Sequence, residues 1–469
     1  MAAKGGRSGF RLLANGLDAF VARATLIELA ERTLDLQYYI FHPDQSGSIV
    51  IDRLVAAADR GVQVRVLLDD WGTMDKNDAA VAALDAHPQI EIRLFNPYTH
   101  RAGLGRFAEL VTSFARVNRR MHNKQLIADG VSVVLGGRNI GDEYFSLGEL
   151  DFQDVDVLAI GPAARQSAHS FESYWKSELE VPVDRLVQHR VDPEKPAAAR
   201  EELRQRCVQL ADSAYGRALS RSSLATELRS EGPRLHWAEA RIITDPPEKL
   251  KKPPGTRSDA FLGGQLSPHV RTVRSDMRVI SPYFVPGKDG VAFFAELRRR
   301  GVDVRVLTNS LAATDVWLVH AGYMKYRRPL LQAGVRLYEL RPEAAGGGGR
   351  GGAKGPRGSG IMIGSSRASL HAKTFVFDRT SVFIGSVNID PRSLQQNTED
   401  GVLVESPELA IEVADLFERW ASPALSYEVT RGAGGRLEWT GGFTSEPHAG
   451  FWRPLGARFF SHLPIESLI

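Results

Sequence analysis

An internal repeat covers most of this 469-residue chain. Residues 61–67 read Gly-Val-Gln-Val-Arg-Val-Leu, and residues 301–307 read Gly-Val-Asp-Val-Arg-Val-Leu. Two further pairs of segments correspond in the same way: residues 33–41 with 276–284, and residues 92–95 with 335–338. Each copy alternates short Val-rich strands with helical segments, which is typical of a mostly parallel sheet covered by helices. The repeat therefore predicts an α/β protein of two similar units, packed face to face with pseudo-twofold symmetry.

The repeat also divides the chain. The stretch between the two copies is polar and rich in Ala and Arg, as expected of a helical connection. After Trp420 the sequence becomes rich in glycine and aromatic residues. We therefore expect four segments: a first unit at 1–183, a helical connecting insertion at 184–235, a second unit at 236–425, and a tail at 426–469 that could contact a membrane.

Each copy ends in the same short motif, H-x-K-x4-D, and the two motifs are 249 positions apart. A Gly-rich strand end that carries an asparagine follows each motif. The residues of the two motifs and the two asparagines are His122, Lys124, Asp129 and Asn139, and His371, Lys373, Asp378 and Asn388. Residues two apart on a strand point to the same face, so each histidine projects beside its lysine. Matched copies in equivalent positions predict a single active site between the units.

The residue types favour phosphodiester chemistry. A lysine beside a histidine makes a poor metal site, because the ammonium repels the cation. The same lysine can bind the nonbridging oxygens of a phosphate and offset charge in the transition state. Asn139 and Asn388 can donate further hydrogen bonds to these oxygens. Asp129 and Asp378 stand at expected hairpin bends, where aspartate suits the backbone, and we expect them to support the site.

Two histidines on opposite sides of a phosphorus permit in-line displacement. One attacks as a nucleophile, and the other protonates the leaving alcohol and then deprotonates the incoming one. Each imidazole then needs a carboxylate on its other nitrogen. Asp154 and Glu399 stand at matching places in the two copies, with Asp156 as a rival for the first place.

No Walker loop, H-E-x-x-H motif or dinucleotide fingerprint occurs, so we expect neither a metal nor an organic cofactor. Cys207 is the single cysteine, which excludes an internal disulfide. No apolar run reaches the roughly 18 residues of a membrane span, and residues 1–9 lack the apolar core of a signal peptide.

At these residues the chain resembles the phospholipase D superfamily, whose mark is a paired H-x-K-x4-D motif. The resemblance covers about residues 9–425 and is strongest to bacterial cardiolipin synthases, particularly the C-type. One departure is Gly137 in the first copy where the second has Ser386. The segments that carry the resemblance, besides the motifs, are residues 36–40, 120–124, 136–145, 307–313, 319–323 and 385–393.

The resemblance implies phosphatidyl transfer without metal, through a covalent phosphohistidine on His122, with His371 as general acid and base. It gives the catalytic set as His122, Lys124, Asp129, His371, Lys373 and Asp378. It gives the phosphate-binding or supporting set as Asn139, Asn388, Ser386, Asp154 and Glu399. The implied substrate is phosphatidylglycerol, with phosphatidylethanolamine as a second candidate, and an accessory protein is compatible with the family.

Two segments suit an anionic membrane surface. Residues 98–124 carry six Lys or Arg side chains interleaved with apolar ones, and residues 451–460 combine aromatic residues with two arginines. Either segment could equally be an amphipathic element packed on the core. We expect peripheral binding at the bacterial inner membrane, on a side that the sequence leaves open. The alternatives are a phospholipase D-type hydrolase and a nuclease of the same superfamily, and the net charge of only +3 makes nucleic acid the weaker partner.

Overall fold

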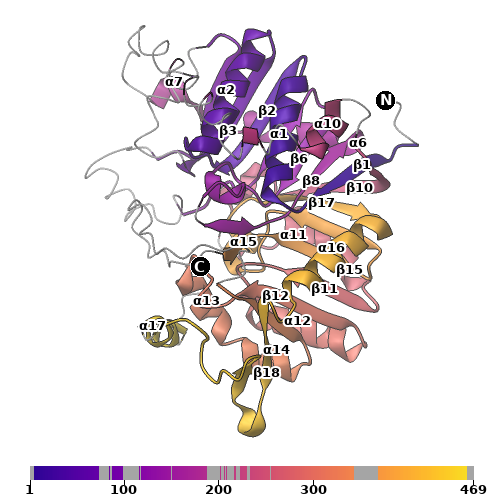
Figure 1. The fold of residues 1–469 in the computed structure, drawn as a ribbon, viewed down its shortest axis with the longest axis vertical. Helices are drawn as coiled ribbons and strands as arrows, with labels where there is room; N and C mark the ends of the chain where they lie inside the picture. The colour runs from indigo at the N-terminus through magenta and orange to yellow at the C-terminus, as the bar shows by residue number, and fades with distance from the viewer. Residues whose placement is uncertain are drawn as a thin grey trace.

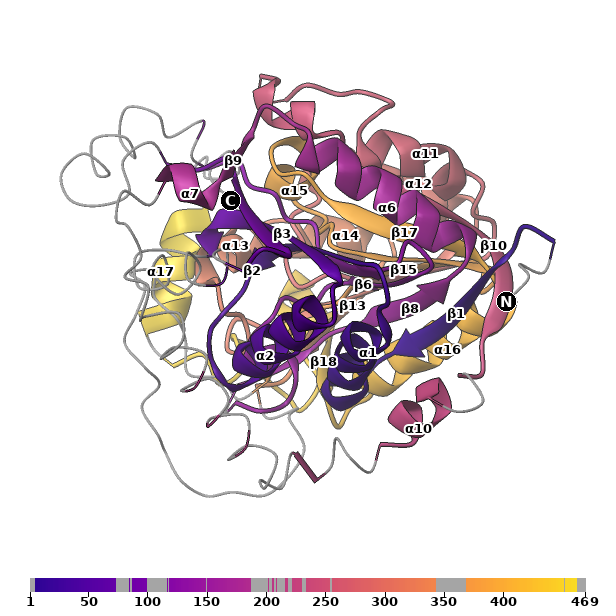
Figure 2. The same ribbon diagram turned by 90° about the horizontal axis from the view of Figure 1, so that it is seen from above.

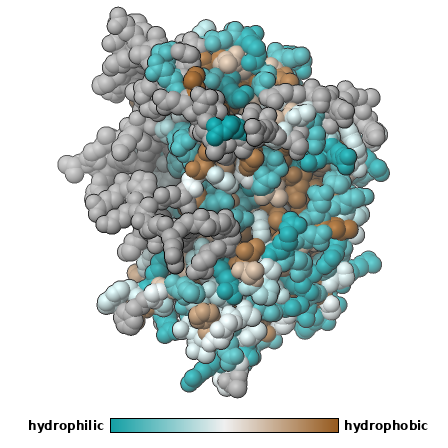
Figure 3. All heavy atoms as spheres, in the orientation of Figure 1, coloured by the Kyte–Doolittle hydropathy of each residue, from teal (hydrophilic) through white to brown (hydrophobic). Residues whose placement is uncertain are grey.

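The computed structural model consists of two stacked α/β units, with the N-terminal unit above the C-terminal one in Figure 1. Within the part of the chain that the structure describes, no helix combines the length and the apolar composition needed to cross a bilayer. On the face drawn in Figure 3, hydrophilic residues predominate between smaller hydrophobic patches. Apart from isolated positions, the structure describes residues 5–72, 87–98, 118–148, 150–186, 222–229, 233–253, 255–342, 368–450 and 452–461.

The first unit is a mixed sheet with a parallel centre. Strands β2, β3 and β4 are parallel neighbours, and the antiparallel strands β5, β6, β8 and β1 continue the sheet from β2, while β9 pairs with β4. The strands are β1 (Ser8–Leu13), β2 (Thr33–Ile40), β3 (Gln63–Gly72), β4 (Ile90–Phe95), β5 (Gln125–Ala128), β6 (Ser132–Gly136), β8 (Asp156–Ile160) and β9 (Glu180–Pro182).

The second unit repeats this order strand for strand. Strands β11, β12 and β13 are parallel, β15, β16, β17 and β10 continue from β11, and β18 pairs with β13. The tail expected from residue 426 therefore begins inside this sheet. The strands are β10 (His236–Thr244), β11 (Asp276–Ile280), β12 (Asp303–Asn309), β13 (Arg336–Leu340), β15 (Lys373–Phe377), β16 (Ser381–Gly385), β17 (Asp400–Glu405), β18 (Ser426–Arg431) and β19 (Leu437–Trp439).

Helices cover the sheets, and besides one buried cluster within each unit a third cluster lies between the units. Helices α6 and α16 follow the equivalent strands β8 and β17, and Figure 2 shows α6 lying along the sheets. The helices are α1 (Gly16–Leu29), α2 (Gln45–Asp59), α6 (Pro162–Trp175), α7 (Val183–Leu186), α10 (Ser223–Arg229), α11 (Leu262–Arg271), α12 (Gly287–Arg299), α13 (Trp317–Met324), α14 (Arg327–Gln332), α15 (Pro391–Gln395), α16 (Pro407–Trp420) and α17 (Trp452–Ser461).

Contacts between the units confirm the predicted face-to-face arrangement. One buried cluster combines residues of both units, among them Leu67 and Ile127 of the first with Leu307 and Ile384 of the second. Strands β1 and β10 pair antiparallel and join the two sheets at their edges. The short strands β7 (Asp151–Gln153) and β14 (Ala368–Leu370) form a second link between the units. The connection expected at 184–235 lies largely outside the described residues, which include the end of α7 and α10.

Candidate active site

Each histidine of the paired motif lies where a backbone segment of one unit pairs with the other unit. The His122 N–H donates to the Thr398 carbonyl oxygen at 2.8 Å. The His371 N–H donates to the Gln153 carbonyl oxygen at 2.9 Å, directly after the pairing of β14 with β7. The two equivalent pairings fix both histidines at the interface between the units.

The carboxylate partners of the histidines are exchanged between the units. His122 Nδ1 is 2.8 Å from Glu399 Oε2, and His371 Nδ1 is 2.6 Å from Asp154 Oδ2. Since a carboxylate accepts hydrogen bonds, each Nδ1 carries the proton and each Nε2 is left for reaction. Each of these two pairs therefore takes its histidine from one unit and its carboxylate from the other.

The rival carboxylate, Asp156, has a different function in the structure. It is fully buried and pairs with two arginines, Arg23 at 2.9 Å and Arg138 at 3.3 Å. Arg138 also donates to the carbonyl oxygen of Asp154 at 2.5 Å. Asp156 therefore stabilises the strand end on which Asp154 lies, while Asp154 contacts the histidine.

The two lysines are buried beside the histidines. Lys124 Nζ donates to the His122 carbonyl oxygen at 2.5 Å, and Lys373 Nζ donates to the His371 carbonyl oxygen. Burial lowers the pKa of Lys124 to about 7 and that of Lys373 to about 8. Lys373 contributes to the lowering at Lys124, so the two ammonium groups are close enough to repel each other. An anion bound between them would relieve this repulsion.

The titration behaviour of the two histidine–carboxylate pairs differs. Burial and the neighbouring lysines lower the pKa of His371 to about 4 and hold the pKa of His122 well below its usual value. Burial alone would raise the pKa of Asp154, yet His371 and Lys373 hold it below its usual range. Burial raises the pKa of Glu399 to about 7, because its neighbours offset less of the cost. Asp154 is thus the more firmly ionised carboxylate.

The departure at Gly137 has a steric cause. A Cβ atom at Gly137 would lie 2.0 Å from Asp154 Oδ1, so the Asp154 carboxylate occupies the space of a side chain. In the second unit, Ser386 Oγ donates to Glu399 Oε2 at 2.5 Å and accepts the Asp400 N–H at 3.0 Å. Glycine with a short carboxylate in one unit thus corresponds to serine with a longer carboxylate in the other.

The two asparagines differ in availability. Asn139 Nδ2 donates to the Tyr144 hydroxyl at 2.9 Å, and Asn139 Oδ1 accepts the Ile40 N–H at 3.1 Å. Asn388 is 2% exposed, and its Oδ1 has no hydrogen-bond partner among the described residues. A phosphate oxygen accepts hydrogen bonds, so either asparagine could bind one only through its Nδ2 group, and Nδ2 of Asn139 is already engaged by Tyr144. Asn388 is therefore the asparagine more available to a phosphate.

The motif aspartates lie at the far ends of the strands from the histidines. Asp129 and Asp378 adopt left-handed backbone conformations, with φ of 55° and 50°. Each carboxylate accepts three successive backbone N–H groups at the start of the neighbouring strand, and the pKa of each is lowered because these bonds outweigh burial. The donors are Glu31, Arg32 and Thr33 for Asp129, and Arg274, Ser275 and Asp276 for Asp378. Through these contacts both aspartates hold together neighbouring strands of the sheets that position the site.

Aromatic residues that sequence reasoning missed enclose the histidines. Tyr39 meets the His122 ring edge-on at 5.0 Å, and the Lys124 ammonium lies 5.5 Å from the same tyrosine ring. Tyr144 and Phe152 contact the His371 ring at 5.2 and 5.1 Å. The signal for Tyr39 was its place at the end of a strand that the repeat predicts.

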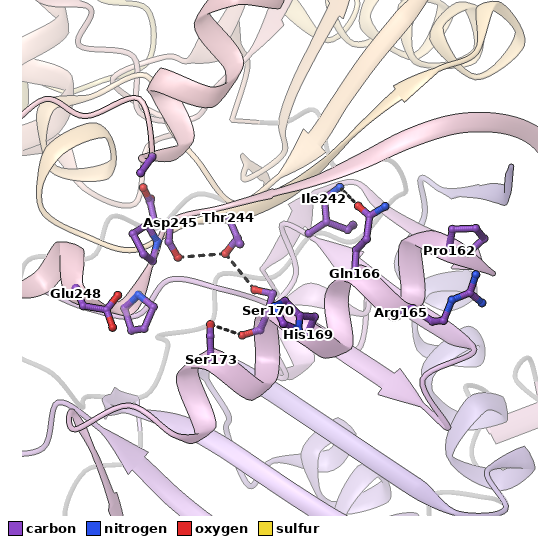
Figure 4. Close-up of a pocket in the computed structure, with 13 residues that line it drawn as sticks. Pro162, Arg165, Gln166, His169, Ser170, Ser173, Ile242, Thr244, Asp245 and Glu248 are labelled. Atoms are coloured by element: carbon purple, nitrogen blue, oxygen red, sulfur yellow. Dashed lines mark hydrogen bonds between the residues drawn. The ribbon is translucent and has the colours of Figure 1, made fainter. Parts of the chain in front are cut away.

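An open pocket of about 720 Å³ lies beside the site, between α6 and the end of β10 (Figure 4). Its wall includes Thr244 and Asp245. The Asp245 carboxylate accepts the Glu399 N–H at 3.0 Å, so the pocket adjoins the backbone that carries Glu399. Among the described residues, the group with the geometry for a metal ion is His42, Asp44 and Glu143, which does not include the paired histidines.

The chain is similar in sequence to a known family and to known proteins. The family described as "Cardiolipin synthase, PLD-like domain" matches residues 24–175 and 270–421. Cardiolipin synthase C of Escherichia coli (strain K12) is 40% identical over 473 residues, covering 99% of this chain and 97% of that protein. Cardiolipin synthase A of Pseudomonas syringae pv. syringae (strain B728a) is 26% identical over 409 residues, covering 87% and 67%.

A solved structure supports the fold. Phosphatidylserine synthase from Haemophilus influenzae Rd KW20 has a TM-score of 0.61 at 13% identity, covering 98% of this chain and 94% of that one. The two segments matched by the family each contain one copy of the motif and together make up more than half of the chain. The resemblance carried by the paired motif is therefore confirmed. The chain belongs to the cardiolipin synthase, PLD-like domain family and is a phosphatidyltransferase of the phospholipase D superfamily.

Proposed function

We propose that this phosphatidyltransferase transfers the phosphatidyl group of one phospholipid to a hydroxyl of phosphatidylglycerol, and so makes cardiolipin. The observation that carries the proposal is the pair of imidazoles, each with Nδ1 on a carboxylate of the opposite unit and each beside a buried lysine. The full-length similarity to cardiolipin synthase C of Escherichia coli supports the choice of lipid. Phosphatidylglycerol or phosphatidylethanolamine would serve as donor.

The first half of the reaction forms a covalent intermediate. Nε2 of His122 attacks the phosphorus of the donor, and the bond from phosphorus to the headgroup oxygen breaks. His371, which takes up a proton on Nε2 when the anionic donor binds, gives that proton to the oxygen, and the headgroup alcohol leaves. The lysines and the Asn388 amide bind the nonbridging oxygens through the transition state.

The second half reverses the proton transfer. The acceptor hydroxyl gives its proton to His371 Nε2 while its oxygen attacks phosphorus, and the bond from phosphorus to His122 breaks. Both histidines return to their starting protonation states. The balance of atoms needs no metal or redox partner.

The electrostatics support this division of labour. Burial and Lys373 lower the pKa of His371 to about 4, and the ionised Asp154 opposes this lowering, so an anionic donor bound beside it would let His371 take up the proton that a general acid needs. Glu399, with its pKa raised to about 7 by burial, offers His122 less negative charge, and burial lowers the pKa of His122 itself. An uncharged imidazole is what a nucleophile requires.

Product analysis tests the proposal. The purified chain is incubated with vesicles of phosphatidylglycerol alone and with added phosphatidylethanolamine, and the lipids are identified by mass spectrometry. We expect cardiolipin with release of glycerol or ethanolamine. Phosphatidic acid as the main product would make the chain a hydrolase, and cleavage of plasmid DNA without any lipid product would make it a nuclease.

The intermediate has its own test. Vesicles carrying donor lipid with a radioactive phosphate are mixed with the enzyme and quenched in alkali, which preserves phosphorus–nitrogen bonds. We expect label on the protein, lost on acid treatment and absent in His122→Ala. Label that persists in His122→Ala and disappears in His371→Ala would reverse the two roles.

A further inference from the structure

Helix α17 presents a row of exposed apolar side chains. Trp452, Leu455 and Phe459 are 77%, 54% and 65% exposed, which is unusual for large hydrophobic residues. Their spacing of three and four residues places them on one face of the helix. Arg458, also exposed, is next to Phe459. This face has the composition of a helix that lies in a membrane interface.

The opposite face of α17 is docked on the second unit. Ala457 is fully buried, and Phe460 meets the Trp317 ring edge-on at 5.3 Å. Arg453 donates to the carbonyl oxygen of Leu311 at 3.2 Å. Both ribbon views show α17 beside α13, on the outside of the molecule (Figures 1 and 2). The exposed row is therefore held outward by a helix that already has its own packing partner.

The segment under α17 also reaches the active site. Leu311 and Trp317, which contact α17, lie on either side of Asp315 in the chain. Asp315 accepts the Tyr283 hydroxyl at 2.7 Å and is close enough to Lys373 to oppose the lowering of its pKa by burial. Just before this segment, Asn309 makes two hydrogen bonds to the backbone of Leu370, the residue before His371. One short stretch of chain thus connects the exposed row with the catalytic histidine.

We propose that α17 inserts its Leu455 and Phe459 face, with Trp452 at the edge, into the interface of an anionic phospholipid bilayer, and so places the active site on the surface that holds its substrates. The role in substrate delivery rests on the proposed function, whereas the membrane contact does not. A bilayer fits better than a second protein, because aromatic side chains beside arginine suit the headgroup region and anionic lipids attract Arg458.

The test removes the two apolar side chains and leaves the docked face intact. The double variant Leu455→Ser/Phe459→Ser is compared with Ile411→Ser, which removes a 44% exposed apolar side chain from α16. Flotation with phosphatidylglycerol vesicles measures binding. Turnover is measured on the same vesicles and on short-chain phosphatidylglycerol dissolved as monomers. The thermal unfolding midpoint of each variant checks that the fold is kept.

We expect the double variant to bind vesicles at least about tenfold more weakly, since burial of either side chain contributes roughly that factor. Its turnover on vesicles should fall in parallel while turnover on monomers is kept, and Ile411→Ser should match the parent chain in both. Unchanged flotation of the double variant would overturn the proposal. So would an equal loss of turnover on monomers, or a dimer of the parent chain that the double variant breaks.

The two proposals fail separately. A parent chain that floats with vesicles, loses flotation in the double variant and yet makes no lipid product would remove the proposed function and keep the membrane contact. A parent chain that makes cardiolipin from vesicles with no loss in the double variant would keep the proposed function and remove the role of α17.

Discussion

The two histidine sites occupy equivalent places in the repeat, and they differ in the charge around them. Asp154 lies near Arg138, Lys373 and His371, and their positive charge holds its pKa below the usual range against the effect of burial. Burial raises the pKa of Glu399 to about 7, although Lys124 opposes the rise, and the carboxyls of Asp390 and Asp400 also lie close to Glu399. The same backbone geometry therefore supports two imidazoles of different character, which is what two different steps of one reaction require.

Removal of either imidazole should have the largest effect on activity. For transfer between natural lipids, we expect His122→Ala to lower kcat/KM by about 10⁴-fold or more and His371→Ala by roughly 10²- to 10⁴-fold. A donor with nitrophenol as the headgroup separates the roles, because nitrophenolate leaves without a proton. We expect a burst of nitrophenolate with His371→Ala and none with His122→Ala, measured by absorbance in a stopped-flow instrument. Bursts of equal size in both variants would contradict the assignment.

Loss of charge on the carboxylates should have unequal effects. Asp154→Asn removes a firmly ionised group, and we expect kcat/KM to fall by about 100-fold or more. Glu399→Gln removes a carboxyl whose pKa is about 7, and we expect a loss of roughly tenfold near neutral pH. Steady-state kinetics at pH 7 measures both. A larger loss in Glu399→Gln would show that Glu399 carries the essential charge and would exchange the two roles.

Gly137 and Ser386 occupy equivalent positions beside the two carboxylates, and substitutions there test the comparison through steric contacts. Gly137→Ala places a Cβ 2.0 Å from Asp154 Oδ1, so the carboxylate must move away from His371. We expect a loss of about 1–3 kcal/mol in the free energy of unfolding and an activity that approaches that of Asp154→Asn. Chemical denaturation and kinetics measure the two effects. An unchanged Gly137→Ala enzyme would mean that Asp154 can shift at no cost.

Ser386→Ala is the matched change in the second unit. It removes a hydrogen bond to Glu399 and introduces no clash, so we expect a loss of about 1–2 kcal/mol in the free energy of unfolding and a smaller loss of activity than in Gly137→Ala. Ser386→Thr keeps the hydroxyl and serves as the control.

Much of this arrangement could be predicted from the sequence, because a repeat conveys both fold and site. Matching segments such as residues 61–67 and 301–307 predicted two α/β units, and the motifs predicted both histidines as site residues. Asp154 and Glu399 could be identified as carboxylate candidates, but their exchange between units could not. That exchange depends on contacts between residues more than 200 positions apart, such as His122 with Glu399, and local patterns do not encode them.

The sequence also did not show which side chains already have partners in the folded protein. The sequence gives Asn139 and Asn388 the same place, yet Asn139 is engaged by Tyr144 and Ile40, and the sequence pattern does not show which side chains bond to one another. The basic stretch expected to contact lipid, residues 98–124, lies largely outside the described residues. The docked and exposed faces of α17 could be separated only by packing, since its sequence is equally typical of a core helix.

The smallest expected effect is a change in thermal stability on anion binding by the two lysines, of which each unit contributes one. A lysine is charged below its pKa, and the pKa values of Lys124 and Lys373 are lowered to about 7 and about 8 by burial. Sulfate keeps the same charge between pH 6 and 9, so any change in its binding must come from the protein. We expect sulfate to raise the thermal unfolding midpoint by a few degrees at pH 6 and to lose this effect as pH rises through about 7 and 8. Lys124→Met/Lys373→Met should show no sulfate effect at either pH, and a stabilisation independent of pH in the parent chain would place the anion elsewhere.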